Sequence, residues 1–160
     1  MKRTVKVVLV CLALVCLATT SVSAAGKGKG SLRLGLEFGE PLAVIIIRPA
    51  PFDFKIGYDF ADNGWLFLSA DYRIVSGFQL IDFLHLFLSA GVYTQIYFDR
   101  DDPVDFGLRV PVGLQVFLIN NVLEIFLEVA PTIGFVPRIE AFPSWQGYIG
   151  FTVLIPKFWK

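Results

Sequence analysis

A strict alternation of apolar residues with polar or small ones constrains this chain more than any other feature. Between Asp105 and Leu118, every even-numbered residue is Phe, Leu or Val, whereas the odd-numbered residues are polar, glycine or proline until Phe117. A period of two is the period of a β-strand, because successive side chains point to opposite faces of a sheet. The segment therefore predicts a strand with one apolar face and one polar face.

The same alternation recurs along most of the chain. Six further stretches carry it: 32–39, 52–60, 65–74, 85–96, 123–130 and 146–153. An eighth candidate strand, 42–47, is apolar on both faces, so the pattern does not indicate which face points inward. Together these stretches predict an all-β fold, an eight-stranded antiparallel up-and-down transmembrane β-barrel.

Residues typical of turns separate the predicted strands. They are grouped at Gly39–Pro41, Arg48–Pro51, Ala61–Gly64 and Asn120–Asn121, with a charged loop at 99–103, a last loop at 137–144 and a less clear connection at 76–82. The outward connections are expected at 39–41, 61–64, 99–104 and 134–144. All of them are short, which argues against adhesion through long external loops.

Residues 1–25 have the organisation of a cleavable signal peptide. Lys2, Arg3 and Lys6 precede an apolar run at 7–18, which is too short to span a membrane, and cleavage is expected after Ala24 or Ala25. Residues 26–30 then form a flexible basic leader, and 31–160 the barrel domain. Lipidation at Cys16 is an alternative to simple cleavage.

Composition excludes several classes of function. Both cysteines, Cys11 and Cys16, lie in the signal peptide, so neither disulfides nor cysteine metal sites are expected in the mature chain. Removing the three basic residues of the signal peptide takes the net charge from zero to about −3, which is unlike a nucleic-acid-binding protein. Mean hydropathy is high, at +0.64, yet no apolar run after residue 25 is long enough for a transmembrane helix.

Alternation alone does not decide which face is inside, because a soluble lipocalin-like barrel has the same period. The apolar face carries four to seven large side chains per strand. An eight-stranded barrel has an interior just wide enough for side chains to fill, so this face is too bulky to be the lumen. The polar face, rich in glycine, is therefore expected inside and the apolar face against lipid.

Charged residues on the polar face are expected to pair within the lumen, because buried charges must be paired or hydrated. The predicted lumenal ion network is structural and contains Arg33, Glu37, Asp53, Lys55, Asp59, Asp71, Arg73, Arg109, Glu124 and Glu128.

Several short stretches resemble those of small OmpA-like outer-membrane β-barrel proteins of spirochaetes, which are of uncharacterised function. The stretches are Gly39–Pro41, Ala70–Tyr72, Leu108–Leu114, Leu127–Pro131 and the closing strand with Gly147 and Gly150. The resemblance covers nearly the whole mature chain. It implies a barrel in the outer membrane and supplies no catalytic residues. The end of the chain departs from the pattern, because Pro156 interrupts the last predicted strand.

Enzymatic and metal sites find little support in the sequence. The single histidine, His85, shares a strand face with Ser89, but this pair is expected at the periplasmic end, far from outer-leaflet lipid. The acidic residues Asp99, Asp101, Asp102 and Asp105 lack the spacing of a calcium loop. No catalytic, cofactor or metal site is therefore predicted, and no cofactor is expected.

The expected function is that of a small, non-enzymatic, monomeric barrel of the cell outer membrane, with a plugged polar lumen and a structural role in membrane integrity. Its expected partners are outer-membrane lipid and, during biogenesis, the barrel-insertion machinery, with no nucleic acid. Two alternatives stay open. One is a surface binding module that holds a host protein or small ligand through loops 99–104 and 134–144. The other is a soluble periplasmic lipocalin-like lipid carrier.

Overall fold

The computed structural model of this chain describes residues 31–39, 43–59, 64–98, 101–137 and 139–155. The predicted signal peptide 1–25, the leader 26–30, Cys16 and the tail after Ile155 lie outside these residues. Within the described ranges, no helix has the length and apolar character needed to cross a membrane.

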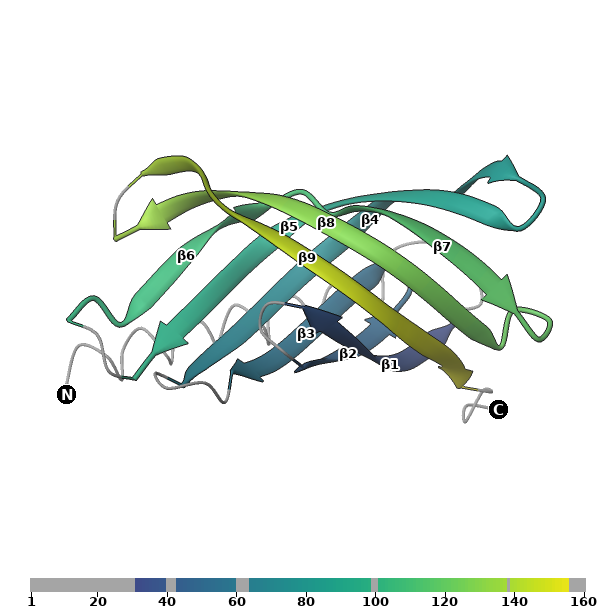
Figure 1. Cartoon of the computed structure of the whole chain (residues 1–160), viewed down its shortest axis with the longest axis horizontal. Coiled ribbons are helices and arrows are strands. Elements are labelled where there is room, and N and C mark those ends of the chain that lie inside the picture. Colours follow the sequence, from purple (N-terminus) through teal and green to yellow (C-terminus); the bar gives the residue numbers. More distant parts are fainter. Residues whose placement is uncertain (1–30, 40–42, 60–63, 99–100, 138, 156–160) are drawn as a thin grey trace.

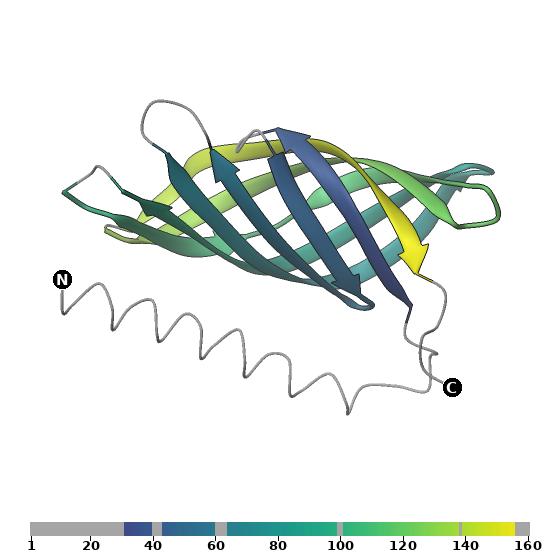
Figure 2. The same cartoon turned by 90° about the horizontal axis from the view of Figure 1, so that it is seen from below.

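The described chain is all-β and forms one antiparallel sheet that closes into a ring (Figures 1 and 2). Consecutive strands pair along the chain except β6 and β7, and the first strand also pairs with the last. The strands are β1 (Leu32–Gly39), β2 (Ala43–Pro49), β3 (Phe52–Asp59), β4 (Trp65–Ile81), β5 (Leu84–Tyr97), β6 (Val104–Arg109), β7 (Val112–Leu118), β8 (Leu123–Val136) and β9 (Glu140–Ile155).

Nine strands fill eight places around the ring, because β6 and β7 share one place. Both pair with β5 on one side and with β8 on the other. They are the two halves of the segment predicted as a single strand, interrupted at Val110 and Pro111. Proline has no N–H to give to a ladder, so an interruption is expected there. Its carbonyl still accepts a hydrogen bond from the Ser89 N–H, at 2.8 Å.

The polar face of the alternation points to the interior of the ring, as predicted. Arg109 and Gln115 are each only 1% exposed, whereas Leu108 and Val112 on the other face are 42% and 40% exposed. Because the side-chain period is two, this choice of face in one strand constrains every strand paired in register with it. The ring therefore has a charged interior and an apolar outer surface.

The structure assigns a register to β2, which the apolar pattern of 42–47 left open. Val44, Ile46 and Arg48 are buried, whereas Ile45 and Ile47 are exposed. The prediction that Arg48 begins a turn was wrong, because β2 continues through Arg48 to Pro49. The pairing Arg33↔Arg48 explains the extension, since it brings Arg48 next to buried carboxylates inside the ring.

Two predicted connections are strands instead. Residues 76–81 belong to β4, which turns into β5 only at Asp82 and Phe83. Most of the predicted loop 134–144 belongs to β8 and β9, which are separated by residues 137–139 alone. The regular pattern fades there because β-bulges interrupt the pairing of β4 with β5 and of β8 with β9. Each bulge inserts extra residues and so breaks the alternation with a period of two.

Aromatic and aliphatic side chains fill the interior beside the charges. One cluster contains Val44, Phe67, Tyr93 and Tyr148, and another contains Ile46, Phe87 and Phe126. Tyr148 is only 2% exposed, so its side chain belongs to the interior of the ring.

Candidate functional site

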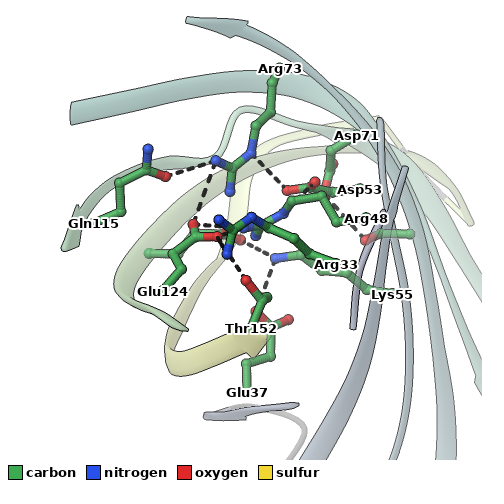
Figure 3. A network of polar contacts seen from close by, with 12 residues as sticks. Arg33, Glu37, Arg48, Asp53, Lys55, Asp71, Arg73, Gln115, Glu124 and Thr152 are labelled. Atoms are coloured by element: carbon green, nitrogen blue, oxygen red, sulfur yellow. Dashed lines mark hydrogen bonds and ion pairs between the residues drawn. The ribbon is translucent and has the colours of Figure 1, made fainter. Parts of the chain in front are cut away.

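Ten charged side chains meet inside the ring in a network of short ion pairs (Figure 3). Five are cationic and five are anionic, and each is no more than 9% exposed. They come from β1, β2, β3, β4, β6 and β8. The alternation along each strand is what aims them at one another, since all ten occupy the inward face.

The first half of the network, which we call the arginine group, contains Arg33, Arg48, Arg73, Asp53 and Glu124. Arg48 donates to Asp53 and to both carboxylate oxygens of Glu124, each at 2.6 Å. Arg73 donates to the other oxygen of Asp53 at 3.0 Å. Asp53 thus bridges cations from two different strands, β2 and β4, which satisfies more of its lone pairs than a single ion pair does.

Arg33 and two uncharged side chains complete the arginine group. Arg33 lies 3.7 Å from Glu124 and donates to the backbone carbonyl of Asn121. Thr152 donates to Glu124 at 2.7 Å, and Arg73 donates to Gln115 at 2.8 Å. Glu124 therefore receives hydrogen bonds from both a guanidinium and a hydroxyl.

The second half, which we call the carboxylate group, contains Glu37, Asp71, Glu128, Lys55 and Arg109. The Lys55 ammonium lies 2.6 Å from Glu128 and 3.1 Å from Glu37. Arg109 pairs with Glu128 and lies 3.3 Å from Asp71. Glu128 is therefore shared between Lys55 and Arg109.

Charge is balanced over the whole network but not within its halves. The arginine group has three cations and two anions, whereas the carboxylate group has two cations and three anions. Asp53 and Lys55 link the halves, because they lie two residues apart on the inward face of β3. Since a buried charge without a partner is costly, the two halves stabilise each other.

Aromatic rings cover the faces of the cations. The Arg73 guanidinium lies 4.3 Å from the centre of the Phe87 ring, and Arg48 lies 5.3 Å from that of Phe126. Lys55 lies 5.3 Å from the Tyr148 ring. Such contacts are more favourable when water is excluded, so the rings both fill space and stabilise the charges.

Interior glycines make room for these rings and charges. A Cβ on Gly150 would lie 2.6 Å from a ring carbon of Phe126 and 2.7 Å from Glu37 Cβ. At Gly147, which points outward, a Cβ would meet nothing within 4 Å. Glycine is thus required where β9 passes the crowded interior.

Nine of the ten residues predicted for the lumenal network lie in these ion pairs. Asp59, the tenth, lies at the end of β3, is partly exposed and belongs to neither group. Arg48 takes the remaining place and was missed, because its neighbours Pro49 and Pro51 suggested a turn. Its charge was the signal in the sequence, because a charged residue that continues the strand fits the polar inward face, which it shares with Ile46 in the structure.

His85 and Ser89, the two residues considered for catalysis, lie on the same face of β5. His85 packs edge-on against Phe117 at 5.4 Å, and its Nδ1 has no hydrogen-bond partner within the described part of the chain. The same holds for the buried Ser89 hydroxyl. Among the described residues, no three His, Cys, Asp or Glu side chains are grouped to hold a metal ion, and Asp99 of the acidic loop lies outside this set.

The outer surface of the ring has the opposite character. Leu34, Ile45, Leu127 and Ile149 are 41–57% exposed, and such residues cover every place in the ring. Of the outward strand positions whose side chains the structure describes, none carries a charge. Apolar surface of this extent on all sides is unusual for a protein surrounded by water, where contiguous patches are small.

Comparison of the chain with protein-family models, curated protein sequences and solved structures gives no match.

Proposed function

We propose that this chain is a small, non-enzymatic β-barrel of the cell outer membrane, with a plugged lumen and a structural role in the envelope. The observation that carries the proposal is the inversion of polarity: paired charges fill the interior, and the outward strand positions are uncharged. Lipid requires an apolar surface and a backbone whose polar groups are all paired. A closed ring of strands meets both requirements.

The plugged interior argues against transport or carriage of a ligand. A soluble lipid carrier needs an apolar cavity, whereas here Arg109, Glu128, Phe67 and Tyr148 are each no more than 2% exposed where the cavity would lie. An open channel needs about 16 strands, twice the number of places in this ring. The interior side chains instead fill the lumen and connect the strands around it.

Localisation and partners follow as parts of the same proposal. The signal peptide would export the chain, the barrel-insertion machinery would fold it, and outer-membrane lipid would surround it as a monomer. The resemblance to OmpA-like spirochaete barrels supports this placement. Leu32 at the start of β1 pairs with Ile155 at the end of β9. The first strand therefore starts, and the last strand ends, on the same side of the membrane, which we assign to the periplasm.

Heat modifiability combined with cell fractionation tests the proposal. The mature chain is expected in the outer-membrane fraction and should migrate differently on a gel before and after boiling. Ion conductance of nanosiemens size in planar bilayers would exclude a plugged lumen. Recovery of the folded chain from the aqueous fraction without detergent would favour a periplasmic carrier instead.

A further inference from the structure

One wall of the ring is much shorter than the rest. The strands β1, β2 and β3, which we call the short wall, contain 8, 7 and 8 residues. Strands β4, β5, β8 and β9 contain 17, 14, 14 and 16 residues. Figure 1 shows this difference, with β1 and β2 ending where β9 continues.

Relative to β8 and β9, the short wall lacks length at the end of the ring away from the paired chain ends. β4 instead extends past β3 at the opposite end, because Trp65 pairs with Asp59 and Tyr72 pairs with Phe52. The pairing of β1 with β9 stops at Gly39↔Tyr148. Beyond it, among the described residues, β9 pairs only with β8, from Gly147 to Glu140. By the orientation proposed above, this end is the one in the outer leaflet.

The apolar heights of the two walls differ. From Leu32 to Phe38, the outward residues of β1 cover about 20 Å along the strand, or about 16 Å along the ring axis at a tilt of about 40°. From Leu123 to Phe135 on β8, the corresponding values are about 41 Å and about 31 Å. The apolar band of such barrels is about 25 Å tall, so the short wall falls short of it and β8 does not.

Polar residues and prolines at the ends of its strands limit the apolar surface of the short wall. Glu40 follows β1 directly at the outer end. Pro49 and Pro51 limit the wall at its other end, where Pro49 pairs with Leu32. Asp59 ends β3. A bilayer of normal thickness would therefore meet polar groups at the outer end of this wall.

We infer that the short wall holds the bilayer locally thinned in the leaflet away from the chain ends, and that it recruits lipids with short acyl chains. The inference rests on the proposed membrane function. A short apolar span is accommodated by thinning of the bilayer, at a modest cost per ångström that selects among lipids of different length. The partner of this surface is thus lipid of a defined chain length.

A second copy of the chain is a weaker candidate for this surface. Lipid tails are as apolar as leucine, so association within a membrane needs small residues that allow close approach, or polar groups that bond across the interface. The outward side chains of β1 and β2 are instead almost all large and aliphatic, as at Leu34, Leu36, Ile45 and Ile47. These branched aliphatic side chains form a surface that packs well against lipid acyl chains.

Quenching of a single tryptophan by brominated lipid tests the inference. In a background of Trp65→Phe, Trp145→Phe and Trp159→Phe, one variant carries Ile45→Trp on the short wall and its control carries Leu127→Trp on β8. Both native side chains are 52% exposed, so the probes are matched. Each variant is reconstituted in equal mixtures of 14-carbon and 18-carbon phosphatidylcholine, with either lipid brominated.

The Ile45→Trp variant should be quenched about twofold more by the brominated short lipid than by the brominated long one, and Leu127→Trp about equally by both. The same ratio at both positions would overturn the inference. Protection of Ile45→Trp from both lipids would indicate a second copy and overturn it as well. If neither variant is quenched by either lipid, the chain is not in the bilayer, and the proposed function fails instead. Leu36→Trp on β1 replaces Ile45→Trp if that variant does not show heat-modified migration.

Discussion

Lys55 on β3 and Glu128 on β8 form an ion pair of 2.6 Å across the full width of the ring. The two strands are four places apart in either direction around it, and the residues are separated by 73 positions in sequence. A single contact therefore ties together opposite walls that no backbone pairing joins. Both side chains are almost entirely buried, so the contact also excludes water from the interior.

The first prediction concerns the coupling between these two residues. Lys55→Met or Glu128→Leu alone should lower the free energy of unfolding by about 3–5 kcal/mol, because each removes one ion pair from buried charges that keep at most one other partner. The double variant should cost less than the sum of the two. Urea unfolding in lipid vesicles, followed by the heat-modified band on a gel, measures all four forms. Additive costs would show that the pair does not couple the walls.

The second prediction compares two arginines of the arginine group. Arg48 is 4% exposed and donates to Asp53 and Glu124 at 2.6 Å, whereas Arg33 is 9% exposed and lies 3.7 Å from Glu124. Arg48→Met should destabilise the fold by about 3–5 kcal/mol and Arg33→Met by about 1 kcal/mol or less. The same urea titration compares them, and equal effects would contradict the geometry.

Much of this fold follows from local pattern. The alternation predicts most strands and their inward faces because the burial of one face repeats every second residue. The alternation also predicts that nine charged residues point to the interior, although it does not identify their partners. The pairs themselves, such as Lys55 with Glu128, depend on how the sheet closes, and no local pattern carries that information.

Two of the wrong predictions involve proline. Pro49 and Pro143 lie in stretches predicted as a turn and a loop, yet β2 and β9 include these residues. Proline is tolerated beside a bulge or at the end of a strand, where no N–H is needed. The pairing of β8 with β9 shifts register just after Pro131, which marks such a place.

The third prediction uses two glycines of β9. Gly150→Ala should lower the free energy of unfolding by about 1–3 kcal/mol, because the new methyl group would collide with Phe126 and Glu37. Gly147→Ala, in open space on the outer side of the same strand, should be neutral or stabilising by up to about 1 kcal/mol, because it restricts the unfolded chain. Equal losses of stability at both positions would argue that β9 is generally intolerant of side chains.

The last prediction tests whether the apolar outer surface faces lipid. Leu127 lies near the middle of β8 and Phe135 near its end, and both side chains point outward. In vesicles, Leu127→Arg should cost about 2–4 kcal/mol and Phe135→Arg at most about 1 kcal/mol, because the penalty for a cation depends on its depth in the bilayer. A surface in water would show no such gradient, since an exposed arginine is solvated equally well at either position. Equal and small costs in folding titrations would therefore place this surface outside the membrane, and would leave the charged interior as the only support for a barrel that spans it.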